Sequence, residues 1–124
     1  MVIAFANNQS MTTIMGTSSI IETDPVEMGS NDRASAVLNA HYLFTQGGTA
    51  TLTWQGQTSN DGVKWTDIIG FTGFATAPTT SPEIKVEGVN GAWLRFQYTF
   101  AIAGGAGGEI AGTCFDLHVR LDHA

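Results

Sequence analysis

The residues with the clearest capacity for chemistry lie near the C-terminus. Four of them are spaced two apart, with a histidine directly after them: Asp116, His118, Arg120, Asp122 and then His123. On a β-strand this spacing places the four side chains on one face, where carboxylates and imidazole can hold a metal ion or move a proton. Arg120 opposes a metal, because its guanidinium repels a cation and pairs with either carboxylate. The pattern therefore favours a solvated strand face with cross-strand ion pairs.

The rest of the sequence lacks the spacing of the common catalytic and cofactor sites. No serine has a base and an orienting acid at a recognisable spacing, and no Cys and His cluster has zinc-ligand spacing. The glycine run at residues 104–108 lacks the lysine and the helix start of a phosphate loop. The single cysteine, Cys114, excludes an internal disulfide and is expected to be a small buried residue. We therefore expect no enzyme, no cofactor and no metal.

The charge balance excludes two further classes of partner. The 124 residues include five Lys and Arg against eleven Asp and Glu, a net charge of −6. Five cations cannot form the basic stripe that nucleic-acid binding needs, and an acidic surface is repelled by anionic membranes. No apolar stretch has the length of a membrane span, and the first residues lack the basic segment of a secretion signal. We expect assembly in a cytoplasm, without nucleic acid or membrane partners.

Alternating side chains predict that these positions lie on β-strands. Residues 48–69 alternate apolar side chains with threonines and then reach Asp61-Gly62, a tight-turn signal. The same period of two recurs in residues 36–44, 93–102 and 111–121. Many short strands with a turn every ten or so residues predict an all-β protein, an antiparallel β-sandwich of jelly-roll or discoidin-like type. The common phase of three long strands predicts a core of Leu52, Trp54, Leu94, Phe96, Tyr98, Phe115, Leu117 and Val119.

Three local expectations follow from the same patterns. The alternation of residues 36–44 places Tyr42 and Phe44 on the face of Leu38. Asn90-Gly91 is a hairpin-type turn signal. Residues 70–81 are expected to form one short strand followed by a surface loop.

The chain is expected to form one domain over residues 14–124, preceded by a distinct segment. Residues 1–13 contain the apolar Val2, Ile3 and Phe5, but a run of Asn and Gln follows them. Two alternatives stay open for this segment: a first edge strand, or an arm that pairs with a neighbouring subunit. In the second case Val2, Ile3 and Phe5 are interface residues.

Three tryptophans are the candidates for ligand contact, because exposed aromatic rings stack on sugars. Trp54 falls in phase with the core, and Trp65 is expected to pack over the central hairpin. Trp93 falls opposite Leu94 and Phe96 and is therefore the best candidate for an exposed ring. It fits a glycan contact and a subunit interface equally well.

Two motifs resemble those of known β-sandwich families. Residues 59–65, SNDGVKW, resemble the S-x-D-G-x-x-W turn of discoidin-like (coagulation factor type) sandwiches, and residues 93–96, WLRF, resemble the strand that follows it there. The strand–SNDG–Trp–strand phrase is also similar to that of small β-sandwich virion proteins of tailed phages, of capsid decoration or head-fibre type. Discoidin-like domains often close a disulfide across their ends, which the single Cys114 excludes. The resemblance implies a β-sandwich and covers about a third of the chain.

These observations favour a non-enzymatic structural protein. The resemblance implies a phage capsid decoration or minor virion protein, assembled in the host cytoplasm, that self-associates and docks on a protein lattice. Low charge and apolar surface residues predict a homo-oligomer, a trimer first and a dimer second. The alternative is an extracellular carbohydrate-binding β-sandwich module, and a weaker one is a secreted adhesin or pilin-like subunit.

Overall fold

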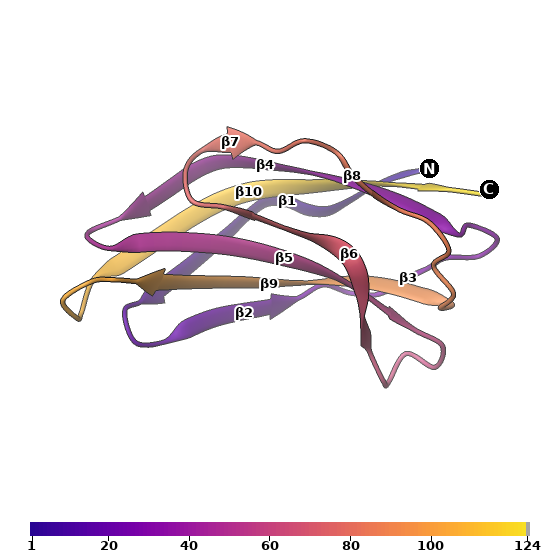
Figure 1. The fold of residues 1–124 in the computed structure, drawn as a ribbon, viewed down its shortest axis with the longest axis horizontal. Coiled ribbons are helices and arrows are strands. Elements are labelled where there is room, and N and C mark those ends of the chain that lie inside the picture. The colour runs from indigo at the N-terminus through magenta and orange to yellow at the C-terminus, as the bar shows by residue number, and fades with distance from the viewer. Residues whose placement is uncertain (124) are drawn as a thin grey trace.

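Ten β-strands build the protein in a computed structural model that describes residues 1–123 (Figure 1). The strands are β1 (Val2–Ile14), β2 (Ser18–Glu22), β3 (Val26–Glu27), β4 (Arg33–Thr45), β5 (Thr49–Ser59), β6 (Thr66–Ala75), β7 (Thr79–Thr80), β8 (Ile84–Val86), β9 (Trp93–Ala103) and β10 (Ile110–Asp122). Alternating side chains explain this all-β outcome, because a period of two leaves one face of each strand apolar. In the described chain no helix is long and apolar enough to span a membrane.

The strands form two antiparallel sheets in the order of a jelly roll. Sheet A runs β1-β10-β4-β7 with β8 also on β4, and sheet B runs β2-β9-β5-β6 with β3 also on β9. The chain can be traced as one long antiparallel hairpin. From its open end to its tip, the paired strands are β1·β10, β2·β9, β4·β8 and β5·β6. Rolling that hairpin brings β10 beside β4 and β9 beside β5, which is the double Greek key. The expected antiparallel β-sandwich is confirmed, and its topology is that of the jelly roll.

The core lies between the two sheets and contains all eight residues expected there. Leu52, Trp54, Leu94, Phe96, Tyr98, Phe115, Leu117 and Val119 are each no more than 1% exposed. Phe96 occupies the centre of an aromatic cluster, with ring centroids 4.7 Å from Phe5, 5.8 Å from Trp54 and 5.5 Å from Phe71. The period-two register of β5, β9 and β10 is therefore confirmed.

Gly56 makes room for one ring of this cluster. A Cβ built on Gly56 would overlap the ring of Phe71, which is fully buried against β5. We expect Gly56→Ala to lower the free energy of unfolding by about 1–3 kcal/mol, the usual cost of overpacking a core. Urea denaturation measures this value, with Gly112→Ala as the control, because a Cβ there would have its nearest neighbours at 3.9 Å and the backbone is not left-handed. Equal stability of the wild type and Gly56→Ala would contradict the placement of Phe71 over Gly56.

Residues 2–14 form the edge strand β1, which is the first of the two alternatives that the sequence left open. β1 pairs antiparallel with β10 from Val2↔Arg120 to Ile14↔Ile110. Ala6, Met11 and Thr13 are buried. The segment is held within its own domain, because β10 supplies its hydrogen-bonding partner.

A β-bulge in β4 overturns the expected position of Tyr42 and Phe44. The register between β4 and β10 shifts between Ala40↔Phe115 and Tyr42↔Cys114, so His41 is an extra residue. A bulge of one residue reverses which face the following side chains occupy. Tyr42 and Phe44 therefore point outward, 52% and 45% exposed, and Leu43 packs on the core instead.

Three smaller expectations also need correction. Asn90-Gly91 does not close a hairpin, because it connects β8 in sheet A to β9 in sheet B. The region after the central hairpin forms the ten-residue strand β6 as well as the short β7. Cys114 is only half-buried, because the alternation of β10 places it on the outer face of sheet A, opposite Tyr42.

Candidate interaction surface

The polar residues of β10 form close pairs along the strand and with β4. His41 Nε2 lies 2.8 Å from Asp116 Oδ2, and Arg120 Nε lies 3.1 Å from Asp122 Oδ2. The Asn8 backbone N–H donates to Asp116 Oδ1 at 2.6 Å, and this bond together with His41 lowers the pKa of Asp116. Within residues 1–123 no three His, Cys, Asp or Glu side chains are grouped so that they could hold a metal ion.

The SNDGVKW segment forms a loop that its own side chains hold in place. Asp61 Oδ1 accepts backbone hydrogen bonds from Val63 at 2.8 Å and Lys64 at 2.9 Å, and a third bond from the Ser59 hydroxyl at 3.0 Å. The bonds from Lys64, Val63 and Ser59 lower the pKa of Asp61. These contacts assign the motif a turn-stabilising role, since the side chains of Ser59 and Asp61 both bond within the loop.

The two outer tryptophans lie on sheet B near the charged end of the molecule. Trp65 is half-buried and packs on Arg95, whose Cζ lies 4.3 Å from the indole centroid. Trp93 is half-buried and lines an open hollow of about 300 Å³ with Glu27, Gly29 and Ala92. A carbohydrate-binding module would have its ring platform here.

The structure does not bring Trp93 together with the other predicted contact residues. Val2 is 68% exposed on β1, whereas Ile3 and Phe5 are half-buried and pack on the core. The ring of Phe5 meets Phe96 edge-on, so it is committed to the interior of this chain. Val2 alone of these three is fully free to contact a partner.

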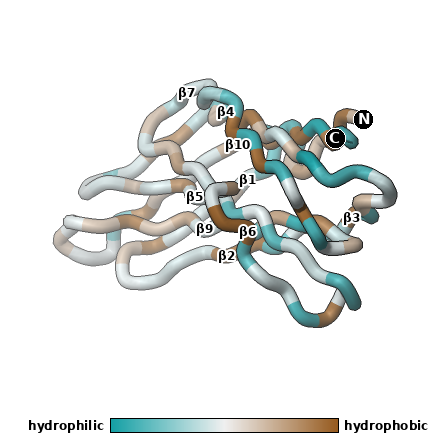
Figure 2. Tube along the Cα trace, turned by 45° about the vertical axis from the view of Figure 1, so that its right-hand side comes forward, coloured by the Kyte–Doolittle hydropathy of each residue, from teal (hydrophilic) through white to brown (hydrophobic). Residues whose placement is uncertain are grey.

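The charges of the protein are segregated along the long axis of the sandwich. The termini lie at one end (Figure 1), and most strongly hydrophilic positions lie toward that end (Figure 2). We call the other half the distal half; it comprises residues 10–20, 41–53, 74–80 and 99–114. Of the eleven Asp and Glu and five Lys and Arg residues, all of them in the described part of the chain, only Glu109 lies in the distal half.

The carboxylate of Glu109 is hydrogen-bonded to the backbone of its own loop. It accepts backbone N–H bonds from Ala106 at 2.7 Å and Gly107 at 2.8 Å. The backbone N–H of Glu109 itself, then those of Gly107 and Ala106, lower the pKa of this carboxyl group. A Cβ on Gly105 would lie 2.7 Å from Glu109 Oε2, so the loop closes tightly over this side chain. The end of the sandwich therefore presents glycine, alanine and threonine loops around one internally bonded carboxylate.

The distal half also exposes a patch of large apolar side chains on the outer face of sheet A. We call it the distal face, and it consists of Ile14, Tyr42, Phe44 and Ile110, which are 45–52% exposed. Ile14 pairs with Ile110 across β1 and β10, and the rings of Tyr42 and Phe44 stack at 6.4 Å. Contiguous apolar surface without charge is typical of protein interaction sites.

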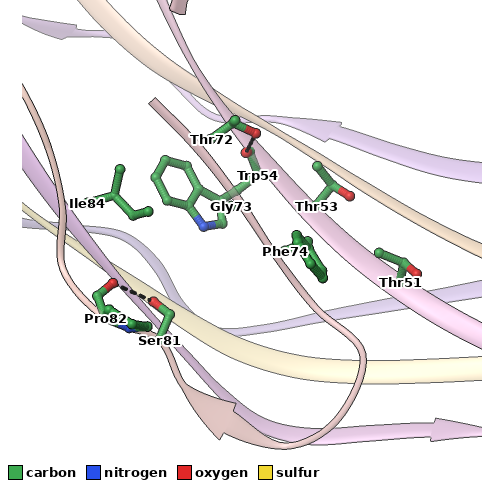
Figure 3. Close-up of a pocket in the computed structure, with 9 residues that line it drawn as sticks. All are labelled: Thr51, Thr53, Trp54, Thr72, Gly73, Phe74, Ser81, Pro82 and Ile84. Atoms are coloured by element: carbon green, nitrogen blue, oxygen red, sulfur yellow. Dashed lines mark hydrogen bonds between the residues drawn. The ribbon is translucent and has the colours of Figure 1, made fainter. Parts of the chain in front are cut away.

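A second apolar feature is a groove of about 620 Å³ between β6 of sheet B and the β7–β8 segment of sheet A (Figure 3). In this view the indole of Trp54 lies between Ile84 and Phe74. A Cβ on Gly73 would lie 2.6 Å from Trp54 Nε1, so the glycine lets the indole extend across β6. The rim carries the hydroxyls of Thr51 and Thr53 but no charged side chain.

Sequence reasoning missed both the distal face and the groove. Their positions depend on the bulge at His41 and on the approach of β6 to β8. Neither feature is visible in the alternation of apolar and polar residues along the sequence. One signal was present, because residues 34–60 and 68–82 contain no Asp, Glu, Lys or Arg. Long uncharged stretches in an acidic chain indicate where charge-free surface is concentrated.

Comparison with solved structures identifies the class of fold. The chain is similar to the VP2 subviral particle of infectious bursal disease virus, with a TM-score of 0.63 and 11% identity over 99% of this chain and 32% of that chain. The structure of the Gx strain of this virus gives a TM-score of 0.58, with 12% identity over 96% of this chain and 30% of that chain. The chain thus spans about a third of the length of these viral chains, and at such identities the likeness is one of fold. No family model matches the sequence, and no curated protein does.

Proposed function

We propose that the protein is a non-enzymatic structural component of a virion. The observation that carries the proposal is the distal half: an apolar, nearly uncharged surface on a chain of net charge −6. Such a surface is costly to leave in water and suits a permanent contact with another protein. The jelly-roll fold, similar to that of the VP2 subviral particle, supports the same proposal.

In its specific form, the proposal is a capsid decoration or minor virion protein of a tailed phage. The strand–SNDG–Trp–strand phrase around residues 59–65 supports this form by resemblance. The distal face docks on the particle lattice, and the charged end with the two termini faces solvent. Self-association accompanies docking, with a homotrimer favoured over a dimer.

Particles purified from the native source test the proposal. We expect negative-stain images and mass spectrometry of these particles to detect the protein, and purified protein to bind particles stripped of it. Phe44→Lys and Tyr42→Lys should each weaken that binding by at least tenfold, because each buries an unpaired charge in an apolar contact.

Val63→Lys is the matched control, because Val63 is 79% exposed at the charged end. It should bind like the wild type. Particles without the protein, or distal-face variants that bind unchanged, would contradict the proposal.

A further inference from the structure

The free edge of β6 carries a rigid apolar protrusion. Between Gln55↔Thr72 and Gln57↔Asp67 the register of β5 and β6 shifts, and residues 68–71 bulge outward. The side-chain amide of Gln55 holds this bulge by donating to Ile68 O at 3.1 Å and Phe71 O at 3.3 Å. Ile69 lies on the bulge and is 95% exposed. An isoleucine so exposed on an anchored segment is suited to insertion into another surface.

The same edge carries an apolar cavity that is large enough to receive such a side chain. The groove beside Trp54 has about 620 Å³, and Phe74 on its wall is 69% exposed. Trp54 is 1% exposed, yet its Nε1 meets no hydrogen-bond acceptor in the described chain. Buried indole N–H groups normally have a partner. The groove wall therefore contains an unpaired N–H donor, buried where Gly73 lies against the indole.

The absence of charge along the β6 edge favours a copy of the same chain as the occupant of the groove. Residues 68–82, which include the protrusion and most of the groove wall, contain no charged side chain. Two molecules of net charge −6 repel each other over most of their surfaces. At this edge the flanking acids already have partners, because Gln57 donates to Asp67 and Lys85 pairs with Glu83. On its outer side β6 has no hydrogen-bonded neighbour among the described strands, so the edge is open to a partner.

We propose that a second copy of this chain docks at the β6 edge, with Ile69 of one copy in the Trp54 groove of the next. The inference rests on the self-association in the proposed function, but it uses a surface separate from the distal face. Protrusion and groove lie at different positions along β6, so a head-to-tail contact between them closes into a ring when the rotation between copies allows it, whereas reciprocal insertion about a two-fold axis gives a dimer. The trimer favoured above is such a ring.

Sedimentation velocity of purified protein over a concentration series tests this inference. The wild type should form a closed oligomer, and Ile69→Lys and Phe74→Lys should each raise the dissociation constant at least tenfold. Both side chains are exposed, so the melting temperatures of these variants should stay close to that of the wild type. Val63→Lys is again the control and should assemble normally.

A mixture of the two variants provides a sharper test. Ile69→Lys keeps an intact groove, and Phe74→Lys keeps an intact protrusion, so the mixture should form heterodimers although each variant alone is monomeric. A monomeric wild type, or oligomers that survive both substitutions, would overturn the inference. Binding to particles through the distal face is measured separately, so wild-type monomers that still bind particles would remove this contact and leave the proposed function standing.

Discussion

Phe96→Ala is expected to lower the free energy of unfolding by about 3–5 kcal/mol, the usual cost of removing a buried phenylalanine ring. Phe96 is 0% exposed and touches aromatic rings from β1, β5 and β6, whose centroids lie 4.7–5.8 Å away. The rigid neighbours cannot collapse into the space, because Trp54 and Phe71 already pack against each other at 5.3 Å. The variant should therefore keep a cavity between the sheets.

Urea denaturation followed by circular dichroism measures this loss. Thr99→Ala is the matched control, because Thr99 lies on the same strand and faces outward. It should change the free energy of unfolding by less than about 1 kcal/mol. If Phe96→Ala unfolds at the same urea concentration as the wild type, the two sheets do not pack around this ring.

The sequence predicted the long regular strands well, because their side-chain period reports directly which face is buried. β9 alternates buried and half-buried residues from Leu94 to Ile102 without interruption, as its sequence indicates. The order of the strands was beyond sequence reasoning. It depends on pairings between residues more than 100 positions apart, such as Val2 with Arg120.

Bulges explain why the sequence pattern misplaced two residues of β4 and left β1 undecided. In β4 the extra residue His41 inverts the phase, so an apparently continuous alternation crosses from core to surface. In β1 the polar residues that suggested an arm lie at a second irregularity, between Ala6↔Leu117 and Gln9↔Phe115. Asn8 adopts a φ of 51° there, which asparagine tolerates better than most residues. Its polar side chain is therefore compatible with a strand that continues on both sides.

The sequence indicated that apolar surface would be exposed, but not where the distal face lies. The contact residues expected from the sequence, Val2, Ile3, Phe5 and Trp93, stay a prediction. The distal face forms only when β1, β4 and β10 align Ile14, Phe44 and Ile110 across three strands. Such an alignment depends on register, and register depends on the whole sheet.

Deletion of residues 1–8 is expected to unfold the domain. Phe5 contributes roughly 2 kcal/mol by burying much of its ring, and each lost ladder hydrogen bond to β10 adds about 1 kcal/mol. The Leu121 backbone N–H donates to Met1 O at 2.9 Å, so the contacts extend to the first residue. Removing them exposes one side of β10 and approaches the full stability of an ordinary domain.

Near-ultraviolet circular dichroism of the truncated protein, with a thermal scan, measures the outcome. We expect the aromatic signal and the cooperative transition to disappear, whereas Val2→Ala, which trims a 68% exposed side chain, should keep both. Phe5→Ala should fall between these two, since it removes the ring and retains the strand. A truncated protein that melts like the wild type and loses only its assembly would favour the alternative in which this segment is an arm. In that case β1 would contribute to a neighbouring subunit rather than to the edge of its own sheet.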